Sequence, residues 1–255
     1  MKKVIISVVA AACLLGARTG AQSPTTPVNA ALRYWMAFAV MKDPPDARNG
    51  ITLELMDRIA AGTAPIDDRI IRVLDENREA LEIMRRASAL PSCDWGLEYE
   101  LGSLTPIAHL AKGRVLGRLN VLAGQRLAAS NQWGQAVDAW IAGVRFSQHL
   151  AQGGSLIAAL SARSILRPAL NAVVKAMAQP SLDAAHRTQI AAVVRALPDA
   201  EFDWDAAMKR EEESVAIYRH QHPGAKTEMA NPVKVNATKE EARAERKQAL
   251  AAVTR

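Results

Sequence analysis

The sequence predicts an all-α fold of antiparallel helical hairpins, packed as a bundle or as a short solenoid. Alanine occurs 49 times among the 255 residues, while aromatic residues make up only 4%. Alanine has the highest helix propensity, whereas strands favour β-branched and aromatic residues. Apolar residues recur at helical spacing along most of the chain, and no segment reads as a sheet strand.

The first 21 residues have the features of a secretory signal peptide. Lys2 and Lys3 precede the 13 residues of an apolar stretch at 4–16, and small residues lead to Ala21. Thirteen helical residues span about 20 Å, less than the ~30 Å hydrocarbon core of a membrane. We expect cleavage after Ala21, a periplasmic or secreted protein, and no transmembrane span after cleavage.

The mature chain is expected to contain a helical domain over residues 22–222, followed by a linker and a terminal helix over 223–255. The first helix ends before Pro44-Pro45, and the second ends at Gly62, a residue typical of helix C-termini. The predicted apolar face of the first helix consists of Leu32, Trp35, Met36, Ala39 and Val40. The predicted second helix carries Leu55, Met56, Ile59 and Ala60.

A third helix is predicted over 67–89. Asn77 falls in its apolar stripe, where a polar residue can fix the register of packing, but we expect it to lie at the border of the stripe. The next segment, 90–102, is the least helical, because Pro91, Gly96 and Gly102 surround Cys93-Asp94-Trp95. Loops often carry functional residues, so this loop is the first candidate site.

Two long helices are predicted next, over 104–130 and 133–152. Gly113, Gly117 and Gly124 recur near one face of the first, which indicates a partner helix at close approach.

Three further helices follow. Ser155 is a plausible N-cap for a helix over 156–177, where Pro168 predicts a kink. The last two helices of the predicted helical domain are expected over 182–197 and 202–220.

The C-terminal segment is predicted to be dispensable for the fold. Residues 223–237 show almost no apolar pattern and are expected to be a flexible linker. Thr238 and Glu241 form a capping-box pair that opens a charged helix without a wide apolar stripe. Residues 223–255 hold seven basic and four acidic side chains, so weak contact of this basic tail with an anionic membrane surface is one alternative.

Residues 117–150 resemble a single tetratricopeptide repeat. Gly124 stands at the small position of the first helix, Leu127 at its aromatic position, and Asn131 at the turn. The second helix matches through Trp133, Ala136, Trp140 and Gly143. The following 34 residues do not repeat the pattern, and a solenoid needs about three stacked repeats. The resemblance therefore implies a helical hairpin and not a peptide-binding array.

The chain as a whole resembles a group of exported bacterial helical proteins. The likeness lies in an Asn-Ala-Ala run at 29–31 followed by Tyr34 and Trp35, and in the Cys93 and Trp95 pair before a long helix. This resemblance implies export and a helical fold, but it supplies no activity or site.

Motifs of known chemistry are missing from the sequence. It contains no His-Glu-x-x-His pair, no phosphate-binding Gly-Lys-Ser/Thr loop, no Gly-x-Ser-x-Gly elbow and no spaced cysteine pair. We therefore expect no metal and no cofactor. His109 and His149 are expected at the surface or at an interface, and Cys93, the one cysteine of the mature chain, is expected as a buried apolar side chain.

The leading interpretation is an exported helical scaffold or protein-interaction protein, more consistent with a binding role than with an enzyme. Removal of residues 1–21 takes away three basic residues and leaves 29 basic against 26 acidic side chains, an excess too small to predict a nucleic-acid partner. The alternative is a hydrolase with an acidic cleft around the Cys93-Asp94-Trp95 loop. Its candidate catalytic residues are Asp94 and Glu98, and Trp95 is the candidate binding residue.

Overall fold

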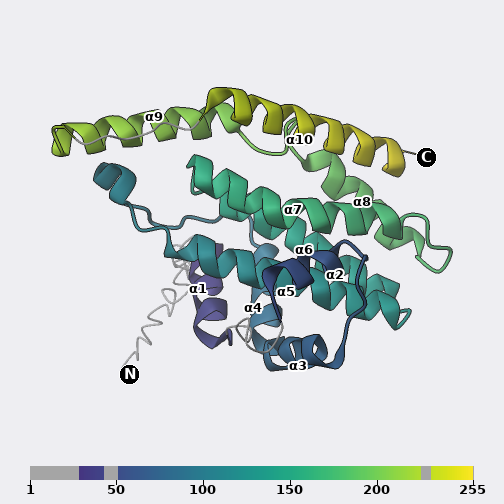
Figure 1. The fold of residues 1–255 in the computed structure, drawn as a ribbon. Coiled ribbons are helices and arrows are strands. Elements are labelled where there is room, and N and C mark those ends of the chain that lie inside the picture. The colour runs from purple at the N-terminus through teal and green to yellow at the C-terminus, as the bar shows by residue number, and fades with distance from the viewer. Residues whose placement is uncertain (1–28, 43–50, 225–230, 255) are drawn as a thin grey trace, which may run out of the picture.

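The computed structural model describes residues 29–42, 51–224 and 231–254, and within them it is helical without any strand (Figure 1). The all-α prediction is confirmed. The predicted signal peptide and Pro44-Pro45 lie outside the described residues. The helices are α1 (Ala30–Val40), α2 (Leu53–Ala60), α3 (Asp68–Glu76), α4 (Arg78–Ser88), the 3-10 helix η2 (Tyr99–Leu104), α5 (Ala108–Ala129), α6 (Trp133–Ala151), α7 (Leu156–Ala176), α8 (Ala184–Ala196), α9 (Trp204–Gln221) and α10 (Pro232–Val253).

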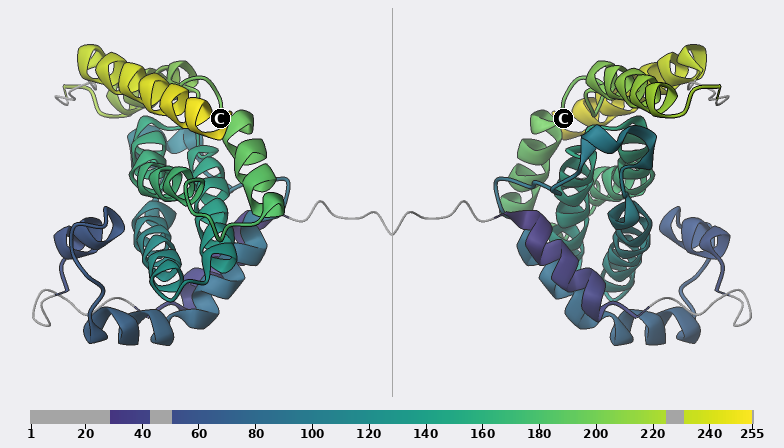
Figure 2. Two further views of the ribbon diagram at one scale, coloured as in Figure 1. Left: turned by 90° about the vertical axis from the view of Figure 1, so that its right-hand side faces the viewer. Right: turned by 90° about the vertical axis from the view of Figure 1, so that its left-hand side faces the viewer.

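The centre of the bundle is formed by α5, α6 and α7, which pack against one another in succession. The pair α1 and α4 packs on one side of this centre, with α2 and α3 beside α5. On the opposite side, α9 and α10 run in opposite directions over α7 (Figures 1 and 2). Helix α9 contacts η2, and α10 contacts α8.

Glycines of α5 permit the close packing of the centre. A Cβ atom on Gly117 would lie 2.7 Å from Ile165 of α7, and one on Gly124 would lie 2.2 Å from Nε1 of Trp140 in α6. Real Cβ atoms do not tolerate such distances, so both positions require glycine. The predicted close approach is confirmed.

In the α5–α6 hairpin, Trp140 of α6 packs against Gly124 of α5. Trp140 is 2% exposed, and its Nε1 donates a hydrogen bond to the Val121 carbonyl at 3.2 Å. Asn131 adopts the left-handed conformation with φ of 59°, as expected for the turn. Ala136 is buried, while Leu127 and Trp133 are half-buried at the edge of the core. Gly143 faces Asn120, whose amide nitrogen is 3.2 Å from the position of an added Cβ.

The predicted apolar face of α1 is wrong. Leu32 and Met36 are 66% and 59% exposed, and Trp35 and Val40 are also exposed. The buried face instead consists of Ala30, Ala31, Tyr34, Ala37 and Phe38. The helix is apolar on nearly every side, so its spacing alone does not decide which face packs.

The predicted helix over 67–89 is broken at Asn77. Its side chain is 1% exposed, so it does not border the stripe as expected. Asn77 donates to the Val73 carbonyl and accepts from the Lys42 backbone N–H at 2.9 Å in both cases. The amide thus satisfies one backbone group in the last turn of α3 and one just after the end of α1.

Helix α7 is long and apolar enough to cross a membrane by length and composition, but 61% of its apolar window is buried inside the protein. It continues as one helix through Pro168. Its contacts with α5, α6, α9 and α10 make it a core helix of the bundle.

The expectation that the terminal helix lacks a packed face is corrected by the structure. Helix α10 begins at Pro232, six residues before Thr238, with Asn231 as its N-cap. Its buried residues are Val235, Ala242, Ala249 and Val253. Val235, Ala242 and Ala249 recur every seven residues and form a narrow packing face. The absence of a wide apolar stripe therefore does not show that the helix is unpacked. Of the predicted linker, residues 225–230 lie outside the described residues.

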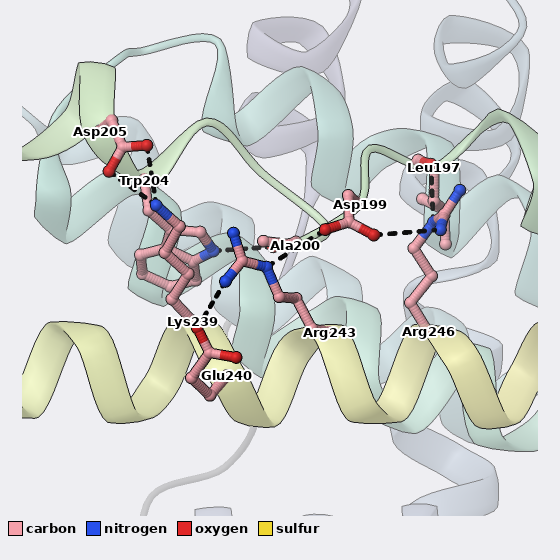
Figure 3. Close-up of polar contacts among 9 residues, drawn as sticks. All are labelled: Leu197, Asp199, Ala200, Trp204, Asp205, Lys239, Glu240, Arg243 and Arg246. Carbon is pink, nitrogen blue, oxygen red and sulfur yellow. Dashed lines mark hydrogen bonds and ion pairs between the residues drawn. The ribbon is translucent and has the colours of Figure 1, made fainter.

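Polar contacts also join α10 to the first turn of α9 and to the segment before it (Figure 3). Lys239 contacts Asp205 at 2.7 Å, and Arg243 contacts Asp199 at 3.1 Å. Arg246 donates a hydrogen bond to the Leu197 carbonyl at 2.8 Å. Three basic side chains of the tail are therefore engaged by the body of the protein.

Candidate functional site

The Cys93-Asp94-Trp95 loop is anchored in the core by Trp95. Its indole is 8% exposed and stacks on His109 with ring centroids 4.5 Å apart. The indole Nε1 donates a hydrogen bond to the His149 carbonyl at 2.9 Å. These contacts make Trp95 a packing residue of this loop.

His109 and His149, expected at the surface or at an interface, are both buried, which excludes the surface placement. His109 is 1% exposed and His149 is 7% exposed. Burial lowers the pKa of His109 to about 4. Burial is also the main cause that lowers the pKa of His149, and the positive charge of Arg145 lowers it further. The Nδ1 atom of His149 lies 2.8 Å from the Tyr34 hydroxyl. Both rings are therefore neutral parts of an aromatic cluster near pH 7.

Asp94 and Glu98 occupy exposed positions on either side of this anchor. One carboxylate oxygen of Asp94 accepts the Gly96 N–H at 2.9 Å. The Asp94 backbone exchanges two hydrogen bonds with the Asn29 side chain, at 2.8 and 2.6 Å. Asn29 is the N-cap of α1, so Asp94 connects the loop to the start of that helix.

Cys93 is buried, as expected from the sequence. Burial is the main cause that raises the pKa of its thiol to about 12, and the nearby negative charge of Asp94 adds to this effect. The thiol is therefore protonated at neutral pH, and a protonated thiol is a poor nucleophile.

A cleft of about 440 Å³ begins immediately after this loop. It lies between residues 97–107, the start of α7 and the middle of α9. Its size is that of a typical ligand pocket. Asp94, Trp95 and Glu98 are not among the residues that line it.

Tight packing of η2 against α9 forms one end of the cleft. Gly102 has a φ of 57°, and an added Cβ there would lie 2.8 Å from the Ser214 carbonyl. The Arg210 guanidinium lies 4.4 Å from the centre of the Tyr99 ring, and the Tyr99 hydroxyl donates to the Gly153 carbonyl. These contacts fix the cleft walls to each other.

The lining is apolar with an acidic border. Apolar side chains come from all three parts of the wall, and carboxylates come from η2 and α9. The apolar residues are Leu97, Ile107, Ile157 and Ile217, and the acidic ones are Glu100, Glu211 and Glu213. Among the described residues, no group of three His, Cys, Asp or Glu side chains is placed to hold a metal ion.

No sequence pattern marks this cleft, because its residues are brought together only by the packing of α9 against residues 97–107. The predicted helix at 104–130 starts four residues later in the structure, at Ala108. Before it, η2 projects Glu100 toward α9, and no local pattern marks that placement.

A second group missed from the sequence is a buried ion cluster between α7, the α8–α9 connection and α10. Glu201 is fully buried with a φ of 67°, and its carboxylate lies 3.4 Å from Arg163. Arg163 also lies 3.3 Å from Glu245 of α10, which contacts Arg167 at 3.0 Å. Burial raises the pKa of Glu201 to about 7, although Arg163 acts in the opposite direction.

Protonation of Glu201 should make the protein more stable at mildly acidic pH. Between its ordinary pKa of about 4.5 and its folded value of about 7, the folded state binds more protons than the unfolded state. The contribution of Glu201 to the free energy of unfolding therefore falls as pH rises through this window. Urea unfolding at pH 5 and pH 7 should show that wild type loses stability relative to Glu201→Gln at the higher pH. A difference between the two proteins that does not change with pH would contradict this assignment.

Comparison with protein-family models, curated proteins and solved structures gives no match for this chain. The function is therefore argued from the cleft itself.

Proposed function

We propose that this protein is an exported helical interaction protein and that its cleft binds a segment of a partner protein. The observation that carries the proposal is the concentration of exposed apolar residues around one preformed cleft. Ile107 and Ile157 line the cleft and are 37% and 47% exposed. Leu101 and Leu104 of η2 and Leu160 of α7 are exposed as well, on two elements that contribute to the lining. Exposed apolar side chains on the elements around a cleft are typical of interaction sites.

The exposed face of α1 supports the same proposal. Leu32, Trp35 and Met36 lie on it, and the Trp35 ring is 6.4 Å from the His109 ring. Trp35 of this face thus contacts the start of α5, two residues after Ile107 of the cleft lining. A partner that covers both would bury a larger area than the cleft alone.

Export and a tetratricopeptide-like arrangement are part of the proposal. The signal-peptide features of residues 1–21 support export. The α5–α6 hairpin supports the repeat-like arrangement through the contact of Trp140 with Gly124. One such hairpin is compatible with a bundle, and a bundle can present a binding cleft as a solenoid does.

A hydrolase is the second candidate, because three carboxylates and several hydroxyl groups line the same cleft. Glu100, Glu211 and Glu213 lie there with Ser103 and Ser214, whose hydroxyl oxygens are 3.5 Å apart. Paired carboxylates perform acid and base steps in glycoside hydrolysis. In that case Glu100→Gln would abolish turnover of a bound substrate and leave its binding intact. In an interaction protein the same change only weakens binding.

Partner capture tests the proposed function. The mature protein, immobilised through its N-terminus, is incubated with envelope extract from the organism that makes it. Ile157→Asp places a charge in the cleft and should remove a partner band that wild type retains. Ala185→Asp is the matched control, because Ala185 is exposed at the start of α8, away from the cleft. Equal capture by wild type and both variants would contradict a role for the cleft.

A further inference from the structure

We infer that the occupant of the cleft is a positively charged amphipathic segment, with apolar side chains on the cleft floor and Lys or Arg side chains at its acidic border. The inference rests on the proposed function, because it specifies the chemistry of the partner. It is carried by two features of one site, an apolar floor and a border with net negative charge.

The floor accepts apolar side chains. Leu97, Ile107, Ile157 and Ile217 contribute it from the loop, the start of α5, α7 and α9. Burial of an exposed isoleucine or leucine against such a floor removes apolar area from water on both partners. A volume of about 440 Å³ holds a few large side chains, so the anchors of a helix fit and a whole domain does not.

The border carries net negative charge. Glu100 comes from η2, and Glu211 and Glu213 come from α9. Arg210 is the one basic residue of the lining, and it is engaged by the Tyr99 ring at 4.4 Å and by Glu213 at 3.5 Å. Three carboxylates against one guanidinium leave a net charge of −2 on the lining.

This combination selects among classes of ligand. Nucleic acids, fatty acids and anionic lipid headgroups are negatively charged, so the acidic border repels them. A polycation without apolar side chains leaves the apolar floor of the cleft uncovered. A cationic amphipathic helix satisfies both parts, with anchors at i, i+3 or i+4, and i+7 on the floor and basic residues on its flanks. Complementary charge also increases the rate of association and reduces binding to wrong partners.

The site is built before the ligand arrives. Gly102 permits η2 to lie against α9, and Tyr99 holds the loop to Gly153 through its hydroxyl. The border carboxylates therefore sit on two elements that are packed together, and binding costs little reorganisation of the walls.

Fluorescence anisotropy with a defined probe tests the inference on the mature full-length protein. The probe is a fluorescein-labelled 14-residue peptide of leucine and lysine with an amphipathic helical pattern. The control probe keeps the leucines and replaces every lysine by glutamate. The test variant is the triple change Glu100→Gln, Glu211→Gln and Glu213→Gln. The matched variant is Glu54→Gln, Glu76→Gln and Glu79→Gln, which removes three exposed carboxylates from α2, α3 and α4.

We expect wild type and the matched variant to bind the lysine peptide with the same affinity, and the cleft variant to bind it about tenfold more weakly. The glutamate peptide should bind none of the three, and added salt should weaken the wild-type complex more than that of the cleft variant. Equal binding by both triple variants, or tighter binding of the glutamate peptide, overturns the inference. Circular dichroism confirms that each variant is folded.

Failure of this inference is distinguishable from failure of the proposed function. If Ile157→Asp removes partner capture but the lysine peptide does not bind wild type, the cleft is an interaction site for a different chemistry. If partner capture is unaffected as well, the proposed function fails.

Discussion

Replacing Trp140 by alanine should lower the free energy of unfolding by about 3–5 kcal/mol. The indole is 2% exposed, occupies the space left by Gly124, and donates a hydrogen bond to the Val121 carbonyl. Alanine leaves a cavity between α5 and α6 and an unfilled hydrogen bond at Val121. Urea unfolding followed by circular dichroism measures the loss.

Trp133→Ala is the matched control for this prediction. Trp133 begins the same helix but is half-buried, and its indole N–H bonds to the Asn131 side chain at the surface. Trp133→Ala should lower the free energy of unfolding by about 1–2 kcal/mol. A smaller loss for Trp140→Ala than for Trp133→Ala would show that Trp140 is not the anchor of the hairpin.

Truncation after Gly224 should lower the free energy of unfolding by about 3 kcal/mol or more, the amount expected from burial of two valines alone. The deletion removes α10, whose Val235 and Val253 are 7% exposed in the intact protein. It also removes Glu245 from the buried ion cluster and leaves Arg163 with Glu201 alone.

Lys239→Ala is the control for the truncation. Lys239 pairs with Asp205, whose side chain is 84% exposed, and such surface pairs contribute little to stability. The truncated protein should melt well below wild type, while Lys239→Ala should melt close to it. Equal melting temperatures for the truncated and intact proteins would contradict this prediction and would show that residues 223–255 are dispensable for the fold.

The fold class and the central hairpin could be predicted because their signals are local. The small Gly124 and the large Trp140 stand in two helices that follow each other along the chain, and the contact between them needs only these two helices. The face of α1 could not be predicted, because Trp35 and Met36 are as apolar as Tyr34 and Phe38.

The candidate site was less predictable because its contacts join distant parts of the chain. Trp95 is fixed by His109 and His149, and Glu100 and Glu211 line the same cleft although more than 100 residues separate them. The packing of α10 is only weakly indicated by the sequence, through apolar residues that recur every seven residues within a charged helix. Charge on one face of a helix does not exclude a narrow packing seam on another.

Site-specific photo-crosslinking tests most directly whether the cleft is the binding surface. A photoreactive phenylalanine derivative is placed at position 157 in the cleft or at position 185 on α8, and each protein is irradiated in envelope extract. Position 157 should give a covalent adduct of defined mass, and mass spectrometry should assign the attached partner peptide to a basic amphipathic segment. Position 185 should give no such adduct. Adducts of the same protein in equal yield at both positions, or adducts at position 185 alone, would contradict the assignment of the cleft as the binding surface.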